Sequence, residues 1–204
     1  MNTKQSIRYW ARLSILAALI IVFTLFNIGN IPVGPIVATI YHIPVVIGAV
    51  ILGLKAGAIL GGLWGVLCFF LAVTGQTTDI VALTAVSRSP FLYFLVAFVP
   101  RIAVGIVTAL VFKALSGAFK DRKLPAYVVS GAVGSLTNTI LYLGLLYVLF
   151  TPLLAEVYSI STTAVFAMVA GVAGTNGIVE AVVSAVITGA VCVAVNKLDG
   201  SSSR

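Results

Sequence analysis

Two charged side chains fall inside long apolar runs of this sequence. Arg101 lies midway along the run 91–115, and Glu180 lies within the run 171–195. A charge placed inside a lipid bilayer costs at least about 2.5–3.5 kcal/mol, so it needs a partner or a watery cavity. Arg101 and Glu180 could form a dry ion pair, or they could line a polar cavity that binds a ligand. The sequence leaves both readings open, and they are compatible with each other.

Further polar side chains share helical faces with these two charges. Residues three or four positions apart lie on one face of a helix. Asn138 and Tyr142 have this spacing in a third apolar run, and Asn176 precedes Glu180 by four positions. If the runs cross a membrane, Arg101, Asn138 and Glu180 lie at similar depth. Three polar stripes at one depth predict an internal cavity with hydrogen-bond donors and acceptors, as in sites for small molecules.

The segment 30–44 is apolar but contains three prolines, including Pro32 and Pro44. Proline opposes a regular helix, and irregular backbone at membrane depth is tolerated only inside protein or against a cavity. We therefore expect a loop that folds over an outward-facing pocket. Asn30, Tyr41 and His42 become candidate ligand contacts. The alternative for Tyr41 and His42 is a location in the lipid headgroup zone.

No catalytic or metal-binding constellation accompanies these residues. His42 is the single histidine, and neither a Gly-x-Ser-x-Gly nor a His-Glu-x-x-His motif occurs. Cys68 and Cys192 lie in apolar runs without ligand spacing, so we read them as packing residues. We expect no catalytic residue, no metal and no cofactor, and hence no enzyme. A Walker lysine loop is also missing, so active uptake would draw its energy from a partner or an ion gradient.

The composition indicates which type of structural element holds these residues in place. Hydrophobic residues make up 61% of the 204 residues and charged residues 8%, whereas soluble domains contain about 45–50% apolar and about 25% charged residues. So few charges also exclude a nucleic-acid-binding surface, despite the net charge of +7. We predict one membrane domain, 1–204, that is an all-α bundle of six transmembrane helices. Their approximate bounds are 7–28, 43–54, 57–73, 91–115, 126–150 and 171–195, and the last helix could begin nearer Thr163.

Basic residues indicate the orientation of this bundle. With six crossings, the two ends of the chain and two of the loops share one side of the membrane. That side carries Lys4, Arg8, Arg12, Lys55, Lys113, Lys120, Arg122, Lys123, Lys197 and Arg204. Because short basic loops remain in the cytoplasm, both termini are predicted to be cytoplasmic.

Small residues recur at the i, i+4 spacing that lets membrane helices approach closely. The runs 57–65, 130–134 and 181–189 carry such ridges, which we assign to packing within the bundle. Ser14 and Ala18 form a shorter ridge on the first helix. Because a first helix often lies on the outside of a bundle, this pair is a candidate contact for another protein.

With these features, the chain resembles the substrate-binding S components of energy-coupling factor (ECF) vitamin transporters. The resemblance covers nearly the whole chain and is carried by Pro32-Val-Gly-Pro35 through Tyr41-His-Ile-Pro44, by Phe98-Val-Pro-Arg101 and by Asn176-Gly-Ile-Val-Glu180. Within the family the chain is most similar to the pantothenate-specific branch. S components for pyridoxine, folate, riboflavin or hydroxymethylpyrimidine share the architecture and remain alternatives.

The resemblance implies partners and a location. A bacterial S component lies in the plasma membrane and works with a transmembrane coupling subunit and two ATPases. Small residues on the first helix dock the coupling subunit, and Ser14 and Ala18 match that position, with serine in place of the usual alanine. The loops 30–43 and 76–90 would close over the vitamin. A stand-alone secondary transporter is a weaker alternative, because the chain is short and lacks two six-helix halves.

Overall fold

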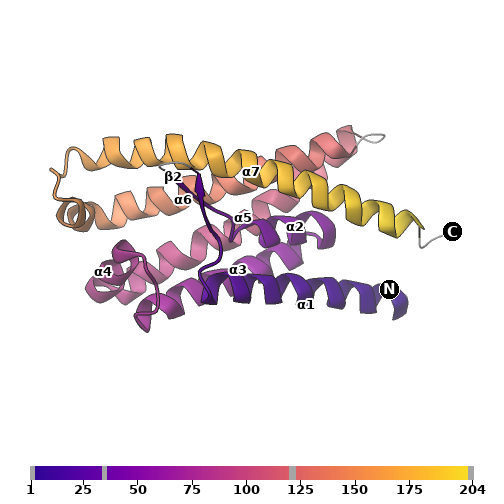
Figure 1. Cartoon of the computed structure of the whole chain (residues 1–204), viewed down its shortest axis with the longest axis horizontal. Coiled ribbons are helices and arrows are strands. Elements are labelled where there is room, and N and C mark those ends of the chain that lie inside the picture. The colour runs from indigo at the N-terminus through magenta and orange to yellow at the C-terminus, as the bar shows by residue number, and fades with distance from the viewer. Residues whose placement is uncertain (1–2, 34–35, 120–122, 202–204) are drawn as a thin grey trace.

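The computed structural model describes residues 3–33, 36–119 and 123–201, and within them it contains seven helices and one pair of short strands (Figure 1). The elements in chain order are α1 (Thr3–Leu25), β1 (Asn30–Val33), β2 (Ile36–Thr39), α2 (Ile43–Leu52), α3 (Leu54–Val73), α4 (Ile80–Arg88), α5 (Pro90–Ala118), α6 (Leu124–Tyr158) and α7 (Val165–Ser201).

Five helices, namely α1, α3, α5, α6 and α7, are long and apolar enough to cross a membrane. The shorter α2 has ten residues, which rise about 15 Å, while the hydrocarbon core of a bilayer is about 30 Å thick. In Figure 1, the hairpin and α2 return the chain from the far end of α1 towards the start of α3. The helix predicted at 43–54 is therefore too short to cross a bilayer by itself.

The segment 30–44 forms a β-hairpin where the sequence analysis expected an irregular loop. Strands β1 and β2 pair antiparallel, with Asn30 opposite Thr39 and Val33 opposite Ile36. Two facing strands satisfy each other's backbone groups, which a buried irregular loop cannot do. The β-branched residues Ile and Val also favour extended backbone. The all-α expectation is therefore corrected by one small sheet.

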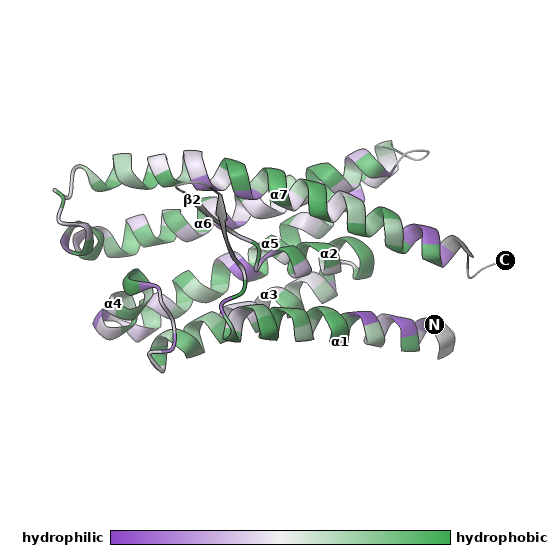
Figure 2. Ribbon diagram, viewed as in Figure 1, coloured by the Kyte–Doolittle hydropathy of each residue, from purple (hydrophilic) through white to green (hydrophobic). Residues whose placement is uncertain are grey.

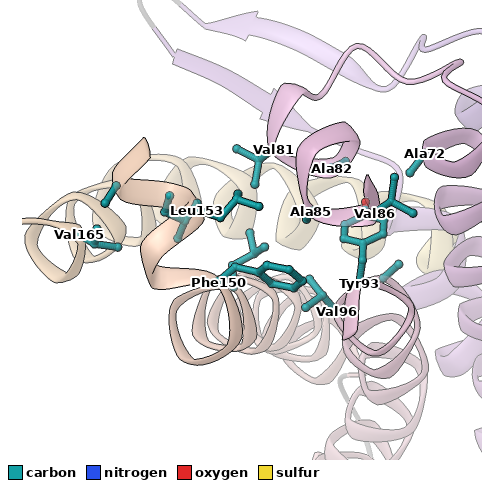
Figure 3. Close-up of a cluster of buried hydrophobic side chains, with 14 residues drawn as sticks. Ala72, Val81, Ala82, Ala85, Val86, Tyr93, Val96, Phe150, Leu153 and Val165 are labelled. Atoms are coloured by element: carbon teal, nitrogen blue, oxygen red, sulfur yellow. The ribbon is translucent and has the colours of Figure 1, made fainter. Parts of the chain in front are cut away.

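The expected loop 76–90 contains helix α4. Asp79 caps this helix, since its Oδ1 accepts hydrogen bonds from the backbone N–H groups of Val81 at 2.9 Å and Ala82 at 3.2 Å. Aspartate before an apolar stretch is a helix-start signal. Helix α4 buries Val81, Ala82, Ala85 and Val86, and Figure 3 shows these side chains facing Tyr93 and Phe150. The helix thus covers one end of the bundle.

Helices α6 and α7 are longer than predicted. Helix α6 continues to Tyr158 through a kink, where Phe150 has non-helical angles (φ −133°, ψ 23°) and Pro152 follows. Proline removes a backbone donor and crowds the preceding turn, which bends a helix. Helix α7 begins at Val165, close to the earlier start near Thr163 that the sequence allowed for the run 171–195.

Glycines bring α3 and α5 into backbone contact. A Cβ atom on Gly61 would overlap the carbonyl oxygen of Arg101, and one on Gly105 would overlap the carbonyl group of Gly57. The predicted ridge on α3 is therefore an internal packing surface, as the i, i+4 pattern indicated. On α6, Gly131 meets the backbone of α7 at Ser184 in the same way. These contacts fix the helices that carry the charged residues.

The start of α1 and the end of α7 lie at the same end of the molecule (Figure 1). Asp199 joins them, because its carboxylate accepts hydrogen bonds from Arg12 at 2.6 Å and 3.0 Å and from Arg8 at 3.1 Å. Figure 2 shows polar residues at this end and mainly apolar residues along the helices between the ends. We call this the terminal end of the bundle.

Candidate ligand-binding site

A cavity of about 300 Å³ lies towards the end of the bundle opposite the terminal end. Its walls come from the segment after α1, the end of the hairpin, the segment between α3 and α4, and helices α3 to α7. Six of the eight residues predicted to bind ligand line it: Tyr41, Arg101, Asn138, Tyr142, Asn176 and Glu180.

Arg101 is held in this cavity by a backbone group that a proline leaves free. Pro100 has no N–H, so the carbonyl oxygen of Val96 lacks its normal helical donor. An Nη of Arg101 donates to this oxygen at 3.0 Å. The guanidinium carbon lies 5.0 Å from the ring centre of Trp64 and 4.4 Å from that of Tyr142, within the range of cation–π attraction. The Pro-Arg sequence thus places a buried cation against two aromatic walls.

The guanidinium keeps unused hydrogen-bonding capacity. Arg101 is 8% exposed, and its Nε has no hydrogen-bond partner among the described residues. A buried donor without a partner is costly, and a guanidinium binds a carboxylate with two parallel hydrogen bonds. An anionic group in the cavity would satisfy both requirements.

Glu180 is hydrogen-bonded to the hairpin and is not paired with Arg101. Its Oε1 accepts hydrogen bonds from the backbone N–H of Thr39 at 2.9 Å and from the Thr39 hydroxyl at 2.6 Å. Within the described part of the chain, Arg101 and Glu180 form no ion pair. The dry ion pair considered from the sequence is therefore not formed, and Glu180 instead fastens β2 to α7.

Comparison with known proteins gives the family of the chain. The family model described as "ECF transporter, substrate-specific component" matches residues 8–192. The chain belongs to this family. It is therefore a subunit of a transporter and not an enzyme, and it is a multi-pass protein of a bacterial plasma membrane.

Two pantothenate transporters of other bacteria are similar to this S component. The chain is 32% identical over 204 residues to the pantothenic acid transporter PanT of Lactococcus lactis subsp. cremoris, covering 94% of this chain and 95% of that protein. It is 28% identical over 172 residues to the pantothenate transporter PanT of Leuconostoc mesenteroides, covering 82% of this chain and 78% of that protein.

Two important lining residues of this S component were not predicted. Trp64 lies in an apolar run and carries no signal beyond its size. Asp79 had a signal, because it is one of only five acidic residues and ends the polar segment 74–79. Besides capping α4, its Oδ2 accepts a hydrogen bond from the Tyr142 hydroxyl at 3.3 Å.

Two polar contacts connect the elements around the cavity mouth. The Tyr41 hydroxyl donates to the Asn27 Oδ1 at 2.5 Å, and the Asn27 Nδ2 donates to the Thr78 hydroxyl at 3.1 Å. Asn27 has a positive φ of 54°, a conformation that asparagine tolerates better than most residues. The end of α1, the hairpin and the segment before α4 are thereby joined through Asn27.

The remaining predicted contacts lie elsewhere. His42 is fully buried before α2 and does not line the cavity. The side chain of Asn30 lies outside the described residues, although its backbone pairs with Thr39. Ser14 and Ala18 are exposed on α1, on the side opposite the buried residues Leu13, Leu16 and Ile20. A small-residue face is therefore accessible at the surface of this S component.

Proposed function

We propose that this S component captures pantothenate from outside the cell in the 300 Å³ cavity and hands it to an ATP-driven import complex. The observation that carries the proposal is Arg101, a buried cation with an unpartnered donor, set between two aromatic rings. It is the one cationic side chain among the described residues that line the cavity. The names of the two relatives support the same substrate.

The chemistry of pantothenate matches the distribution of charge in the cavity. The molecule has a carboxylate at one end, an amide in the middle and two hydroxyl groups flanking a geminal dimethyl carbon at the other end. Arg101 attracts the carboxylate, since charge-assisted paired hydrogen bonds are the strongest that a guanidinium makes. Asp79 and Glu180 repel a carboxylate and accept hydrogen bonds from hydroxyl groups. Asn138 and Asn176 offer both donors and acceptors to the central amide.

We further propose that both termini are cytoplasmic and that the chain makes six crossings. The Asp199 contacts with Arg8 and Arg12 hold the start of α1 beside the end of α7. A chain whose two ends lie on one side of a membrane crosses it an even number of times, so the hairpin with α2 complements the five long helices. The excess of basic residues at the terminal end supports its cytoplasmic location. The cavity then opens towards the outside.

The energy source in this proposal is a coupling subunit with two ATPases. The sequence has no Walker motif, so the chain needs partners if transport is driven by ATP. Ser14 and Ala18 would be the docking contact, because they are small, exposed and lie on the outer face of α1. Small residues allow close helix approach inside a membrane.

A binding experiment on the purified protein tests the substrate and the role of Arg101 together. Trp64 lies in the cavity beside Arg101, and Trp10 is exposed on α1, so Trp10→Phe leaves a single fluorescent reporter at the site. We expect pantothenate to change this fluorescence and to bind measurably in calorimetry. Arg101→Gln should weaken binding strongly, because the carboxylate loses its cation.

The matched control is Arg88→Gln. Arg88 also lies far from the terminal end, but it is exposed and pairs with Glu156 at 3.1 Å. The Arg88→Gln protein should bind pantothenate with the same affinity as the unaltered protein. Equal affinities for folded Arg101→Gln and Arg88→Gln proteins would contradict the assigned role of Arg101. Failure of pantothenate to bind, with binding of another vitamin instead, would overturn the substrate.

A further inference from the structure

A second, smaller cavity of about 120 Å³ adjoins the ligand cavity. The two share four lining residues, which are Asp79, Tyr142, Leu143 and Val172. We call the smaller one the annex. Its other lining residues are Val81 from α4, Leu146, Leu154 and Tyr158 from α6, and Met168 and Val169 from α7.

The annex differs from the ligand cavity in chemistry. The six residues that line it alone are aliphatic or sulfur-containing side chains and one tyrosine, and none of them is charged. Leu146 and Leu154 lie on either side of the kink at Phe150, so the bend of α6 contributes to its shape. An aliphatic cavity of about 150 Å³ holds a benzene-sized group. A volume near 120 Å³ therefore suits a short alkyl group.

Tyr142 stands between the two charges that would orient the ligand. One face of its ring covers the guanidinium of Arg101 at 4.4 Å, and its hydroxyl donates to Asp79 at 3.3 Å. A ligand with its carboxylate on Arg101 and its hydroxyl groups towards Asp79 passes along this ring. The dimethyl carbon lies between the two hydroxyl-bearing carbons, so with the hydroxyl groups at Asp79 it would lie near Asp79 and Tyr142, which also line the annex.

We propose that the annex is the subsite for the geminal dimethyl group of pantothenate, and that it admits analogues in which one methyl is lengthened to a short alkyl chain. This inference rests on the proposed function. It assigns the annex to the ligand itself because the annex adjoins the ligand cavity and shares four lining residues with it. Each methylene transferred from water to an apolar site strengthens binding about fourfold.

The test uses pantothenate and the two diastereomers of an analogue in which one methyl is replaced by n-propyl. The two diastereomers contain the same groups and partition nearly equally into detergent or lipid, so a large difference between their affinities reports a shaped site. We expect one diastereomer to bind at least as tightly as pantothenate. The two added methylenes can raise its affinity by up to about 15-fold. The other should bind more weakly. If both bind much more weakly than pantothenate, the annex does not admit an alkyl chain and the inference is wrong.

Variants then locate the preference in the annex. Val169→Phe fills the annex from α7, so it should weaken pantothenate binding and abolish the preference between the diastereomers. Val182→Phe makes the same change on an exposed face of α7, where Val182 is 59% exposed, and should alter neither. Met168→Ala enlarges the annex and should extend tolerance to a longer chain; it also tests the inference if Val169→Phe does not fold.

The outcomes separate this inference from the proposed function. A preference that survives in a folded Val169→Phe protein, with no added tolerance of longer chains in Met168→Ala, would place the alkyl chain elsewhere and overturn the annex alone. Absence of pantothenate binding to the unaltered protein would overturn the proposed function and this inference together.

Discussion

Removing the hydroxyl group of Thr39 tests whether the contact between the hairpin and α7 retains a bound ligand. Thr39 gives Oε1 of Glu180 two hydrogen bonds, at 2.6 Å from the hydroxyl and 2.9 Å from the backbone N–H. Thr39→Val removes only the first of them and preserves the branched shape of the side chain. The backbone hydrogen bond and the strand pairing remain.

The size of the effect follows from the type of hydrogen bond. A hydrogen bond to a charged acceptor contributes about 1.5–3 kcal/mol. If the hairpin must leave α7 before ligand departs, this loss raises the population of the released hairpin by about 10- to 150-fold. The dissociation rate of pantothenate should rise by the same factor, because departure depends on that population.

Stopped-flow fluorescence of Trp64, in the Trp10→Phe background, measures this dissociation rate. Thr137→Val is the matched control, because among the described residues its hydroxyl bonds only to the Val133 carbonyl oxygen of the same helix, at 2.7 Å. The control should release ligand at the unaltered rate. An unchanged dissociation rate in a folded Thr39→Val protein would refute the reasoning, since it would show that ligand leaves without opening this contact.

Three further predictions concern docking, packing and topology. Ala18→Trp should abolish uptake in cells that contain the ATPase partners but preserve pantothenate binding, because a bulky residue blocks helix approach at an exposed face remote from the cavity; normal uptake would exclude this face. Gly61→Val should destabilise the protein by about 1–3 kcal/mol, since its Cβ overlaps the Arg101 carbonyl oxygen. Gly62→Val should be tolerated, because the nearest atoms lie 3.8 Å from its Cβ. Equal thermal unfolding temperatures for the two variants would contradict this. In a protein without native cysteines, Gln76→Cys should react with an impermeant thiol reagent from outside and Lys123→Cys should not, and the reverse pattern would invert the topology.

The central part of the site was predictable because the membrane makes polar residues conspicuous. Arg101, Asn138 and Glu180 stood out against apolar neighbours, and their positions in successive runs gave a common depth. All three line one cavity. Their partners were not predictable in the same way. Oppositely charged residues suggested pairing, but Glu180 bonds to Thr39, which only the folding of a distant hairpin brings close.

Each element that was misread from the sequence has a physical cause of its own. Prolines in the segment 30–44 indicated irregular backbone, yet strand pairing depends on a facing segment and is not visible in single-residue preferences. Helix α4 is nine residues long, too short for its helical periodicity to be recognised. Its cap at Asp79 was the usable signal. The extension of α6 beyond residue 150 was hidden by Pro152, which bends this helix without ending it.

The glycine contact between α3 and α5 makes one side of the ligand cavity rigid, while the opposite side is more flexible. Trp64 projects from α3 and Arg101 from α5, and the backbones of these helices touch at Gly61 and Gly105, leaving no space for relative sliding. The opposite side is held by hydrogen bonds from single side chains, such as Thr39 to Glu180 and Tyr41 to Asn27. The anchor that we propose for the carboxylate therefore exists in final form before ligand arrives. Adjustment to ligands of different size falls to the hairpin, α4 and the adjoining part of α7.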